Sequence, residues 1–317
     1  MKSLITGISG FAGTFLAEHL VSKNFEVLGV YLQEASLTNL GKTKDKVSLF
    51  KLDLSDKDSV FDFIKQNKPD YIFHLAALTS PSDSFDDPFT TIQNNINAQL
   101  NILEALRKLS FFDTKILVVS SAEIYGLIDK KDLPIDENVS FKPTNPYAVS
   151  KITQDFLGLQ YFLSYNLKVI RVRPFNHIGP RQGDKFVVSA FARKIAEIEK
   201  GKREPVLTVG NLKSKRDFTN VRDMVKAYLL SLEKGTSGDV YNLGSGRSYE
   251  ISEVLDKLLS LSSAKIQVKE DKSLLRPVDN PESVCNYDKF FKITGWKPEI
   301  SLDQTLRDTL DYWRNII

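Results

Sequence analysis

Residues 6–13 read TGISGFAG, and this short stretch decides the fold. It follows an apolar run at Lys2–Thr6 and opens directly into an amphipathic segment at Phe11–Ser22. Glycines at this spacing permit a tight turn and a close approach to a pyrophosphate, whose charge a helix N-terminus stabilises. A glycine-rich loop without a ligand is the alternative, but a strand before and a helix after favour dinucleotide binding. The predicted cofactor contacts in this loop are Gly7, Gly10, Phe11 and Gly13.

The chain up to about residue 175 alternates short β-branched runs with longer amphipathic segments, which is typical of parallel strands joined by helices. The predicted strands are Lys2–Thr6, Glu26–Tyr31, Val47–Leu52, Tyr71–His74, Ile116–Ser120 and Val169–Arg173. The predicted helices are Phe11–Ser22, Asp56–Gln66, Thr90–Leu109 and Tyr147–Ser164. Several strands are apolar throughout, as expected when helices cover both faces of a sheet. We therefore predict an α/β fold and a dinucleotide-binding domain over residues 1–175.

The pattern changes after Pro174, where glycines and prolines separate shorter elements. This change predicts a smaller second domain over residues 176–317, with some later segments returning to the first domain. Its predicted elements are a helix at Phe186–Lys200, a strand at Pro205–Val209 and helices at Ser252–Leu261 and Leu302–Trp313.

Composition excludes several classes of protein. Hydrophobic residues make up 42% of the 317, which is enough for a folded core, and 43 Lys and Arg face 40 Asp and Glu without a like-charged block. We therefore expect no nucleic-acid partner. No apolar run approaches the roughly 20 residues of a membrane span, and the N-terminus shows no signal-peptide pattern. The single Cys285 excludes an intrachain disulfide and a thiolate metal cluster, so we expect no metal and a reducing, cytoplasmic location.

A tyrosine and a lysine stand at catalytic spacing. Of eleven tyrosines, only Tyr147 has a lysine four residues later, Lys151. On a helix these positions share a face, so the ammonium can favour ionisation of the phenol and make it a better proton carrier near neutral pH. An apolar strand also ends at Ser121, at the edge where open α/β sheets bind ligands. A serine there can stabilise charge that develops on a substrate oxygen.

The sequence gives a weaker signal for the residues that would contact the adenosine part of the cofactor. An NAD site usually has Asp or Glu at the end of the second strand, but residues 30–34 read VYLQE, and Glu34 comes late. No arginine stands ready for a 2′-phosphate, although Lys42 or Lys44 could fold back. We expect NADP(H) or NAD(H), with a lean to NADP(H). The pair Asp53 and Leu54 stands where adenine is commonly contacted, or Asp53 caps the next helix.

Together these motifs resemble the extended short-chain dehydrogenase/reductases of the NAD-dependent epimerase/dehydratase family, which act on nucleotide-activated sugars. The resemblance spans nearly the whole chain. It implies a Rossmann doubly wound parallel sheet with a smaller C-terminal α/β substrate domain. It also implies that Ser121 orients the substrate carbonyl, Tyr147 carries the proton, and Lys151 binds the nicotinamide ribose. After the fourth strand, the residues that match the family's cofactor side are Leu75, Ala76 and Ala77.

Residues 173–182, RPFNHIGPRQ, resemble the GDP-sugar branch of this family, especially the reductases that act on GDP-4-keto-6-deoxy-D-mannose. In such enzymes Asn176, Arg216 and Arg276 would hold the diphosphate, a role that suits a guanidinium. Arg216 and Arg276 as surface ion pairs, and His177 as a structural residue, are the alternatives. The implied reaction is NAD(P)H-dependent reduction of the C4 ketone to GDP-D-rhamnose or its C4 epimer, in deoxysugar biosynthesis.

Two other functions stay open. A GDP-mannose 4,6-dehydratase, or another nucleotide-sugar epimerase or dehydratase, is the main rival, because Glu123 stands where dehydratases keep a base. Ala122 in place of a second hydroxyl and the GPRQ continuation favour a reductase. A non-catalytic dinucleotide-binding regulator is the other rival, although such relatives commonly lose the tyrosine or lysine. By the resemblance, helices Thr90–Leu109 and Tyr147–Ser164 would pair two copies into a homodimer.

Overall fold

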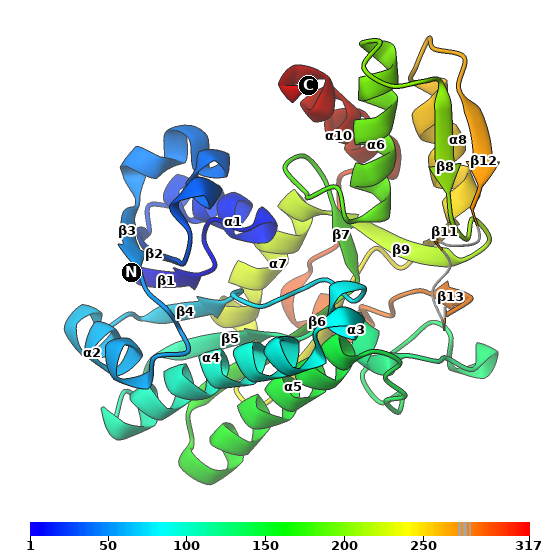
Figure 1. Cartoon of the computed structure of the whole chain (residues 1–317). Coiled ribbons are helices and arrows are strands. Elements are labelled where there is room, and N and C mark those ends of the chain that lie inside the picture. Colours follow the sequence, from blue (N-terminus) through cyan, green and yellow to red (C-terminus); the bar gives the residue numbers. More distant parts are fainter. Residues whose placement is uncertain (272–273, 275–277, 279) are drawn as a thin grey trace.

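A seven-stranded sheet forms the centre of the computed structural model, which describes residues 1–271, 274, 278 and 280–317 (Figure 1). The strand order is β10-β6-β5-β4-β1-β2-β3, and every neighbouring pair runs parallel. The strands are β1 (Lys2–Thr6), β2 (Glu26–Tyr31), β3 (Ser48–Lys51), β4 (Tyr71–His74), β5 (Lys115–Val119), β6 (Lys168–Pro174) and β10 (Val240–Leu243). The order runs outward from β1 in both directions, so the predicted doubly wound α/β fold is confirmed.

Helices cover both faces of this sheet, which explains why β4 and β10 are buried at every position. The helices α1 (Phe11–Ser22) and α7 (Val221–Lys234) pack on one face. The opposite face carries α2 (Lys57–Asn67), α4 (Pro88–Lys108) and α5 (Pro146–Tyr165). Each face therefore has its own hydrophobic core.

A second unit lies beyond the carboxyl ends of the strands (Figure 1). Its core joins three helices, α6 (Val187–Glu199), α8 (Ile251–Ser260) and α10 (Leu302–Ile316). Strand β8 (Val206–Val209) pairs with β12 (Gln267–Glu270). Strand β9 (Lys215–Asn220) pairs with β7 (Asn176–Ile178), β11 (Ser248–Glu250) and β13 (Glu282–Ser283). The shorter elements of the chain are η1 (Glu34–Lys46), α3 (Asp83–Asp86), η2 (Ala122–Tyr125), η3 (Lys130–Asp132) and α9 (Asp288–Thr294).

The chain crosses between the two units more than once. After β9 it returns as α7 to the sheet, and β10 then extends the sheet by pairing with β6. Helix α9 packs near β10 as well. The division into domains at residue 175, with later segments returning to the first domain, stays a prediction. None of the helices in the described ranges is long and apolar enough to cross a membrane.

Candidate active site

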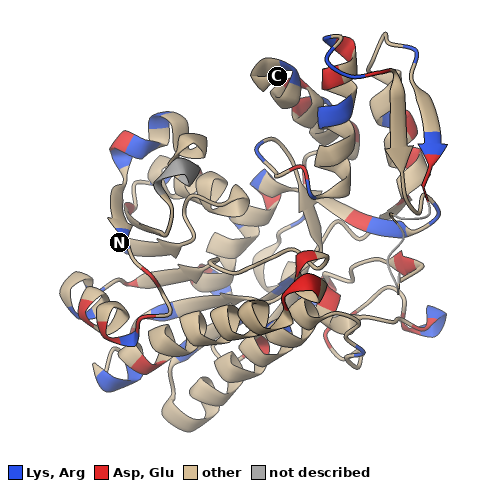
Figure 2. Ribbon diagram, in the orientation of Figure 1, with Lys and Arg blue, Asp and Glu red and all other residues tan. Residues whose placement is uncertain are grey.

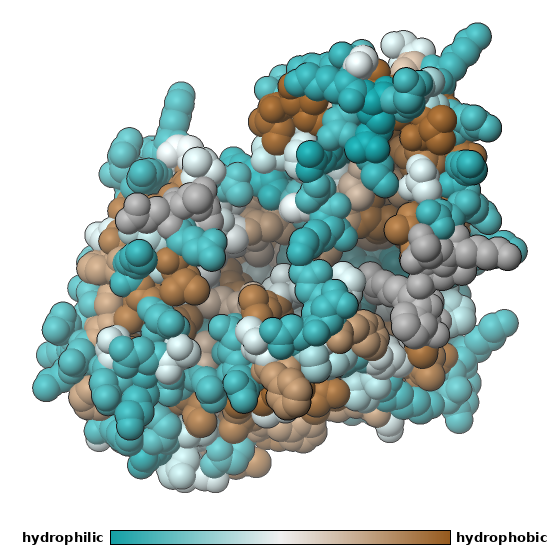
Figure 3. Space-filling view, in the orientation of Figure 1, coloured by the Kyte–Doolittle hydropathy of each residue, from teal (hydrophilic) through white to brown (hydrophobic). Residues whose placement is uncertain are grey.

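A cavity of about 800 Å³ opens at the carboxyl edge of the sheet and continues into the second unit. The surface is visibly hollowed between the two units (Figure 3). The predicted site residues that line it are Gly7, Gly10, Phe11, Gly13, Asp53, Leu54, Leu75, Ala76, Ala77, Ser121, Glu123, Tyr147, Lys151, Asn176 and Arg216. Arg276 lies outside the described residues. Predicted residues from seven separate parts of the chain therefore line one cavity.

The glycine loop forms one end of the cavity. Gly7 has a φ of +70°, and a Cβ there would lie 3.0 Å from the backbone of Ala76. A Cβ on Gly13 would lie 2.2 Å from the carbonyl oxygen of Gly7, so the helix can approach the loop only without a side chain. Helix α1 follows Gly10 with no side-chain cap and no acidic residue in its first turn. Its first N–H groups thus suit an anion, and the loop fits the pyrophosphate of a dinucleotide.

A buried histidine helps to fix the neighbouring strand end. His74 Nδ1 lies 2.9 Å from Thr6 Oγ1, and the same hydroxyl accepts a hydrogen bond from the N–H of Ala76 at 3.2 Å. Burial, and secondarily the charge of Lys151, lower the pKa of His74 to about 3, so the ring is neutral at physiological pH. His74 therefore holds the start of the segment at Leu75–Ala77 against the glycine loop.

The adenosine end carries little negative charge. Tyr31, Leu32 and Gln33 line the cavity after β2. Asp53 is exposed, and its Oδ1 accepts hydrogen bonds from the N–H and hydroxyl of Ser55 at 2.8 and 2.7 Å. Asp56 rather than Asp53 caps α2. The adenine contact of Asp53 and Leu54 stays a prediction, whereas the capping role belongs to Asp56.

The start of α5 positions the predicted catalytic pair, Tyr147 and Lys151. Asn145 caps the helix by accepting a hydrogen bond from the N–H of Ala148 at 2.8 Å, and Pro146 occupies the first turn. Lys151 Nζ then donates to the carbonyl oxygen of Val119 at 2.9 Å, at the end of β5. The Ser120 hydroxyl donates to the carbonyl oxygen of Lys151 at 3.1 Å. These two bonds lock the helix to the strand that carries Ser121.

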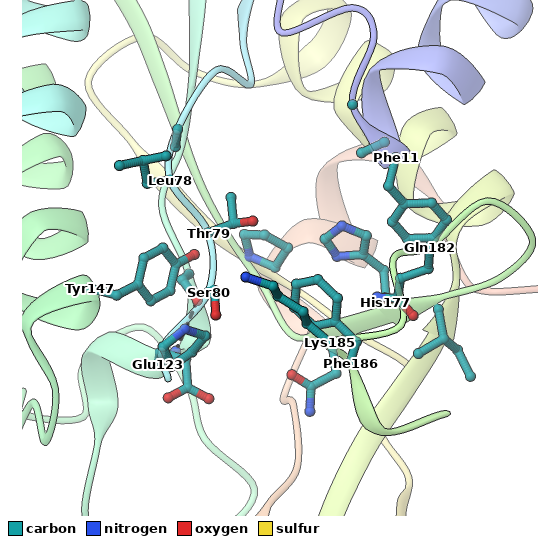
Figure 4. A pocket seen from close by; sticks show the side chains of 18 of the residues that line it. Phe11, Leu78, Thr79, Ser80, Glu123, Tyr147, His177, Gln182, Lys185 and Phe186 are labelled. Atoms are coloured by element: carbon teal, nitrogen blue, oxygen red, sulfur yellow. Dashed lines mark hydrogen bonds between the residues drawn. The ribbon is translucent and has the colours of Figure 1, made fainter. Parts of the chain in front are cut away.

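Ser121 joins the strand end to the tyrosine. Its Oγ accepts a hydrogen bond from the N–H of Glu123 at 3.1 Å, and its side chain also forms a hydrogen bond with the side chain of Tyr147. Glu123 lies on the same side of the cavity as Tyr147 (Figure 4). The Nδ2 of Asn145 donates to Glu123 Oε2 at 3.3 Å. The four predicted catalytic groups are thus within one connected arrangement.

Burial dominates the ionisation of this pair. It raises the pKa of Tyr147 well above the ordinary value, the Ser121 hydrogen bond lowers it, and the charge of Glu123 raises it. Burial also lowers the pKa of Lys151 to about 7. The Lys151 ammonium lies 5.9 Å from the centroid of the Tyr147 ring. In the chain alone burial shifts both groups toward their neutral forms, so assistance from Lys151 to ionisation of Tyr147 stays a prediction.

The opposite wall comes from the chain after β6. His177 stacks on Phe11 with ring centroids 5.8 Å apart and an interplanar angle of 5° (Figure 4). Burial lowers the pKa of His177, and Gln182 Nε2 donates to its carbonyl oxygen at 3.0 Å. This arrangement supports the structural alternative for His177, which holds the glycine loop against the second unit.

Three cationic side chains line the part of the cavity that the chain after β7 forms. Arg216 Nη1 donates to the carbonyl oxygens of Asn280 and Lys215 at 2.7 and 2.9 Å. Lys185 pairs with Asp83 at 2.5 Å, across the mouth where α3 carries its acidic residues (Figure 2). Lys194 reaches the cavity from α6. We did not predict the two lysines, because no motif marks them and only the placement of the second unit brings them here.

Comparison with known proteins decides the family. A family model described as GDP-mannose 4,6 dehydratase matches residues 4–309. The chain belongs to this family. The resemblance that the sequence motifs indicated is therefore confirmed.

Individual relatives of the family are similar over the full chain. The GDP-6-deoxy-D-mannose reductase of Pseudomonas aeruginosa is 34% identical over 316 residues, which cover 99% of this chain and 97% of that protein. The GDP-mannose 4,6-dehydratase of Vibrio cholerae is 29% identical, covering 96% of this chain and 91% of that protein. The structure of RMD from Pseudomonas aeruginosa complexed with NADPH has a TM-score of 0.88 and 33% identity, covering 100% of this chain and 99% of that one.

Proposed function

We propose that the protein is an NAD(P)H-dependent reductase of the C4 ketone of GDP-4-keto-6-deoxy-D-mannose, forming GDP-D-rhamnose or its C4 epimer. The observation that carries the proposal is the single cavity that joins the glycine loop, the Ser121–Tyr147–Lys151 group and Arg216. The end-to-end similarity to a GDP-6-deoxy-D-mannose reductase supports the choice of substrate.

Each residue of the group has a distinct task in this proposal. Ser121 donates a hydrogen bond to the C4 carbonyl oxygen, and Tyr147 delivers a proton to it. Lys151, anchored on Val119, binds the nicotinamide ribose. Asn176 and Arg216 hold the diphosphate, the second through its forked guanidinium. The nicotinamide cofactor, when bound along the glycine loop, supplies the hydride.

We infer a preference for NADPH over NADH. The described residues that line the cavity at the end of β2 and directly after it are Tyr31, Leu32 and Gln33, and they offer no carboxylate to the ribose hydroxyls. The relative solved with NADPH supports the same choice. Initial rates at equal concentrations of the two cofactors test it, and a faster rate with NADH would overturn it.

Dehydration of GDP-mannose is the second candidate function. Glu123 lines the cavity, where it could remove a proton from the sugar, and a dehydratase is among the relatives. Incubation with the keto sugar and NADPH, and separately with GDP-mannose alone, decides between the two. We expect turnover only in the first mixture. Conversion of GDP-mannose without added reductant would replace the reductase proposal with the dehydratase.

The catalytic group has its own test. Tyr147→Phe removes the proton donor and keeps the ring, so we expect turnover to fall by about a thousandfold or more while the cofactor still binds. Cofactor fluorescence measures binding in the same samples. Unchanged turnover in this variant would contradict the role of Tyr147, whereas cofactor binding without any turnover in the wild type would favour a protein that only binds the dinucleotide.

We also propose a homodimer that forms through α4 and α5. Val149, Phe156 and Leu163 recur every seven residues on α5, and they are 43%, 50% and 67% exposed. Such spacing places them on one face, and the neighbouring helix α4 carries Phe89, which is 78% exposed. Native mass spectrometry should show a dimer that Phe156→Glu dissociates and Phe291→Glu, on the equally exposed far helix α9, does not. A monomeric wild type would refute the proposal.

We place the enzyme in the cytoplasm. Cys285 is buried and unpaired, which suits a reducing compartment. Fractionation of the source cells followed by immunodetection tests the location, and recovery in a membrane or secreted fraction would refute it.

A further inference from the structure

The backbone of Arg181 has an uncommon conformation in the turn that follows β7. Its φ is +70°, which lies in the left-handed region that favours glycine over residues with a Cβ. Glycines stand close by, at Gly179 and Gly183, yet an arginine occupies the strained position. Such strain persists where the surroundings hold a residue in place, and it clusters at functional sites. The contacts of the Arg181 side chain provide that hold.

The Arg181 side chain reaches from this turn to α1. Its Nη1 lies 2.6 Å from Glu18 Oε1, and its guanidinium carbon lies 4.5 Å from the centroid of the Phe15 ring. Both partners belong to the helix that begins at the glycine loop. The charged side chains are 25% and 35% exposed, so solvent screens their attraction less than that of a fully exposed pair. Arg181 therefore ties the turn to the cofactor side of the molecule.

The next residue, Gln182, is tied to the second unit. Its carbonyl oxygen accepts a hydrogen bond from the Ser189 hydroxyl at 2.6 Å, and that hydroxyl accepts one from Trp313 Nε1 at 3.0 Å. Ser189 is fully buried in α6, and Trp313 belongs to α10. Consecutive residues of one turn are thus bound to different units, Arg181 to α1 and Gln182 to α6 and α10.

This turn adjoins the place where the two units meet across the cavity. Gln182 lines the cavity close to His177 and Phe11 (Figure 4), whereas Arg181 is not among the described residues that line it. In the proposed function the glycine loop holds the cofactor, and Arg216 of β9 holds the diphosphate of the keto sugar. The approach of hydride to ketone then depends on the spacing of the two units. A misplacement of about 1 Å can slow a reaction about 100-fold.

We propose that Arg181 is a positioning residue that holds α1 and the second unit at the spacing that aligns the cofactor with the keto sugar. The inference rests on the proposed function. It assigns to Arg181 an effect on the rate of hydride transfer rather than on binding, since cofactor and sugar nucleotide each bind mainly to one unit.

Arg181→Gly tests the proposal, because glycine suits the left-handed backbone and the substitution removes only the side chain that ties the units. In a single turnover with NADPH and the keto sugar, stopped-flow absorbance should show hydride transfer slowed by about 10- to 100-fold at full amplitude. Isothermal titration should give dissociation constants for NADPH and for GDP within about threefold of the wild type. The melting temperature should stay within about 4 °C.

Matched variants separate positioning from a general loss of stability. Glu18→Gln should slow hydride transfer in the same direction, and the double variant should be no slower than Arg181→Gly, because both remove one interaction. Arg181→Lys keeps a cation for Glu18 and should retain the rate within about threefold. Arg314→Ala breaks the ion pair with Glu199, whose exposure is similar but which joins α10 to α6 within the second unit. It should lower the melting temperature without slowing hydride transfer.

The remaining outcomes would overturn the proposal or the function beneath it. A wild-type rate of hydride transfer in Arg181→Gly would overturn the proposal, whether its amplitude is full or is reduced by loss of folded protein. Equal slowing by Arg314→Ala would overturn it as well. If Arg181→Gly fails to fold, Glu18→Gln decides alone, and an unchanged rate in that variant overturns the proposal. A wild type that transfers no hydride from NADPH to the keto sugar would instead contradict the proposed function.

Discussion

Tyr228 of α7 carries a buried hydroxyl without a hydrogen-bond partner among the described residues. Such a group has lost its contact with water and gained none in return, which costs about 1–3 kcal/mol. We therefore expect Tyr228→Phe to leave the melting temperature unchanged or to raise it by about 2 °C or more. Tyr241→Phe is the control, because the Tyr241 hydroxyl accepts a hydrogen bond from Thr236 at 3.0 Å and its loss should destabilise. If Tyr228→Phe lowered the melting temperature more than Tyr241→Phe does, the prediction would be contradicted.

Lys151 should make stability depend on pH. Its pKa is about 7 in the folded protein and about 10.4 in an unfolded chain, so between these values the unfolded state binds more protons. The cost of burying the ammonium is therefore complete below about pH 7 and falls as pH rises. Lys151→Met lacks this cost, so its gain in unfolding free energy over the wild type should be larger at about pH 6 than at about pH 9.

Urea denaturation at the two pH values measures that difference. Lys200→Met, which removes an exposed lysine, should show the same stability relative to the wild type at both. If the difference in unfolding free energy between Lys151→Met and the wild type did not change with pH, the pKa of Lys151 in the folded protein would equal that in the unfolded chain.

The proposed trio of Ser121, Tyr147 and Lys151 could be predicted from sequence because its members stand at strand and helix ends whose order in the chain is informative. The effect of burial on their pKa values could not be predicted from sequence. Sequence spacing places the Lys151 ammonium near the phenol, but only the packed structure shows that both groups lose water. Lys185 and Lys194 were not predicted for a related reason, since their approach to the cavity depends on how α6 packs against the rest of the chain.

Among the elements, β9 depends on one buried carboxylate. Asp217 accepts hydrogen bonds from the N–H groups of Ser245, Gly246 and Cys285 at 2.7, 2.8 and 3.1 Å, and from the Ser245 hydroxyl at 2.6 Å. Asp217→Asn keeps the size but turns one acceptor into a donor, so we expect a loss of about 2–4 kcal/mol in unfolding free energy. Chemical denaturation measures it, and a loss below about 0.5 kcal/mol would show that the loop rearranges freely.

Helices α4 and α5 were predicted to within two residues at both ends. Helix α5 begins at Pro146, one residue before its predicted start, because the Asn145 cap and the following proline are written in the local sequence. Helix α4 begins at Pro88 rather than Thr90, since Asp87 caps it through the N–H of Thr90. Helix α7 and strand β9 were not predicted. Strands β7 and β10 were missed as well, and each of these two strands is only three or four residues long and pairs with a strand far away in sequence.

At the scale of the whole molecule, the central sheet is completed by β10, which follows the first strands of the second unit in the chain. Strand β10 covers the edge of β6, and α7 fills the core on one face with Met224, Val225 and Leu232. Residues 1–175 alone would therefore expose both the strand edge and this core. We expect that fragment to aggregate or to lack cooperative unfolding, in contrast to the full chain. Circular dichroism and gel filtration test this, and a soluble, cooperatively melting fragment would contradict it.

The return of the chain through α7 and β10 also limits how this enzyme can diversify. A substrate-recognition module attached as a tail can be exchanged by one recombination event or one engineered fusion point. Here the strands that begin the second unit, β7 to β9, are inserted between β6 and β10 of the same sheet. A graft of new sugar specificity must accordingly replace an internal insert with two junctions, and both junctions must restore the register in which Val240 faces Arg171.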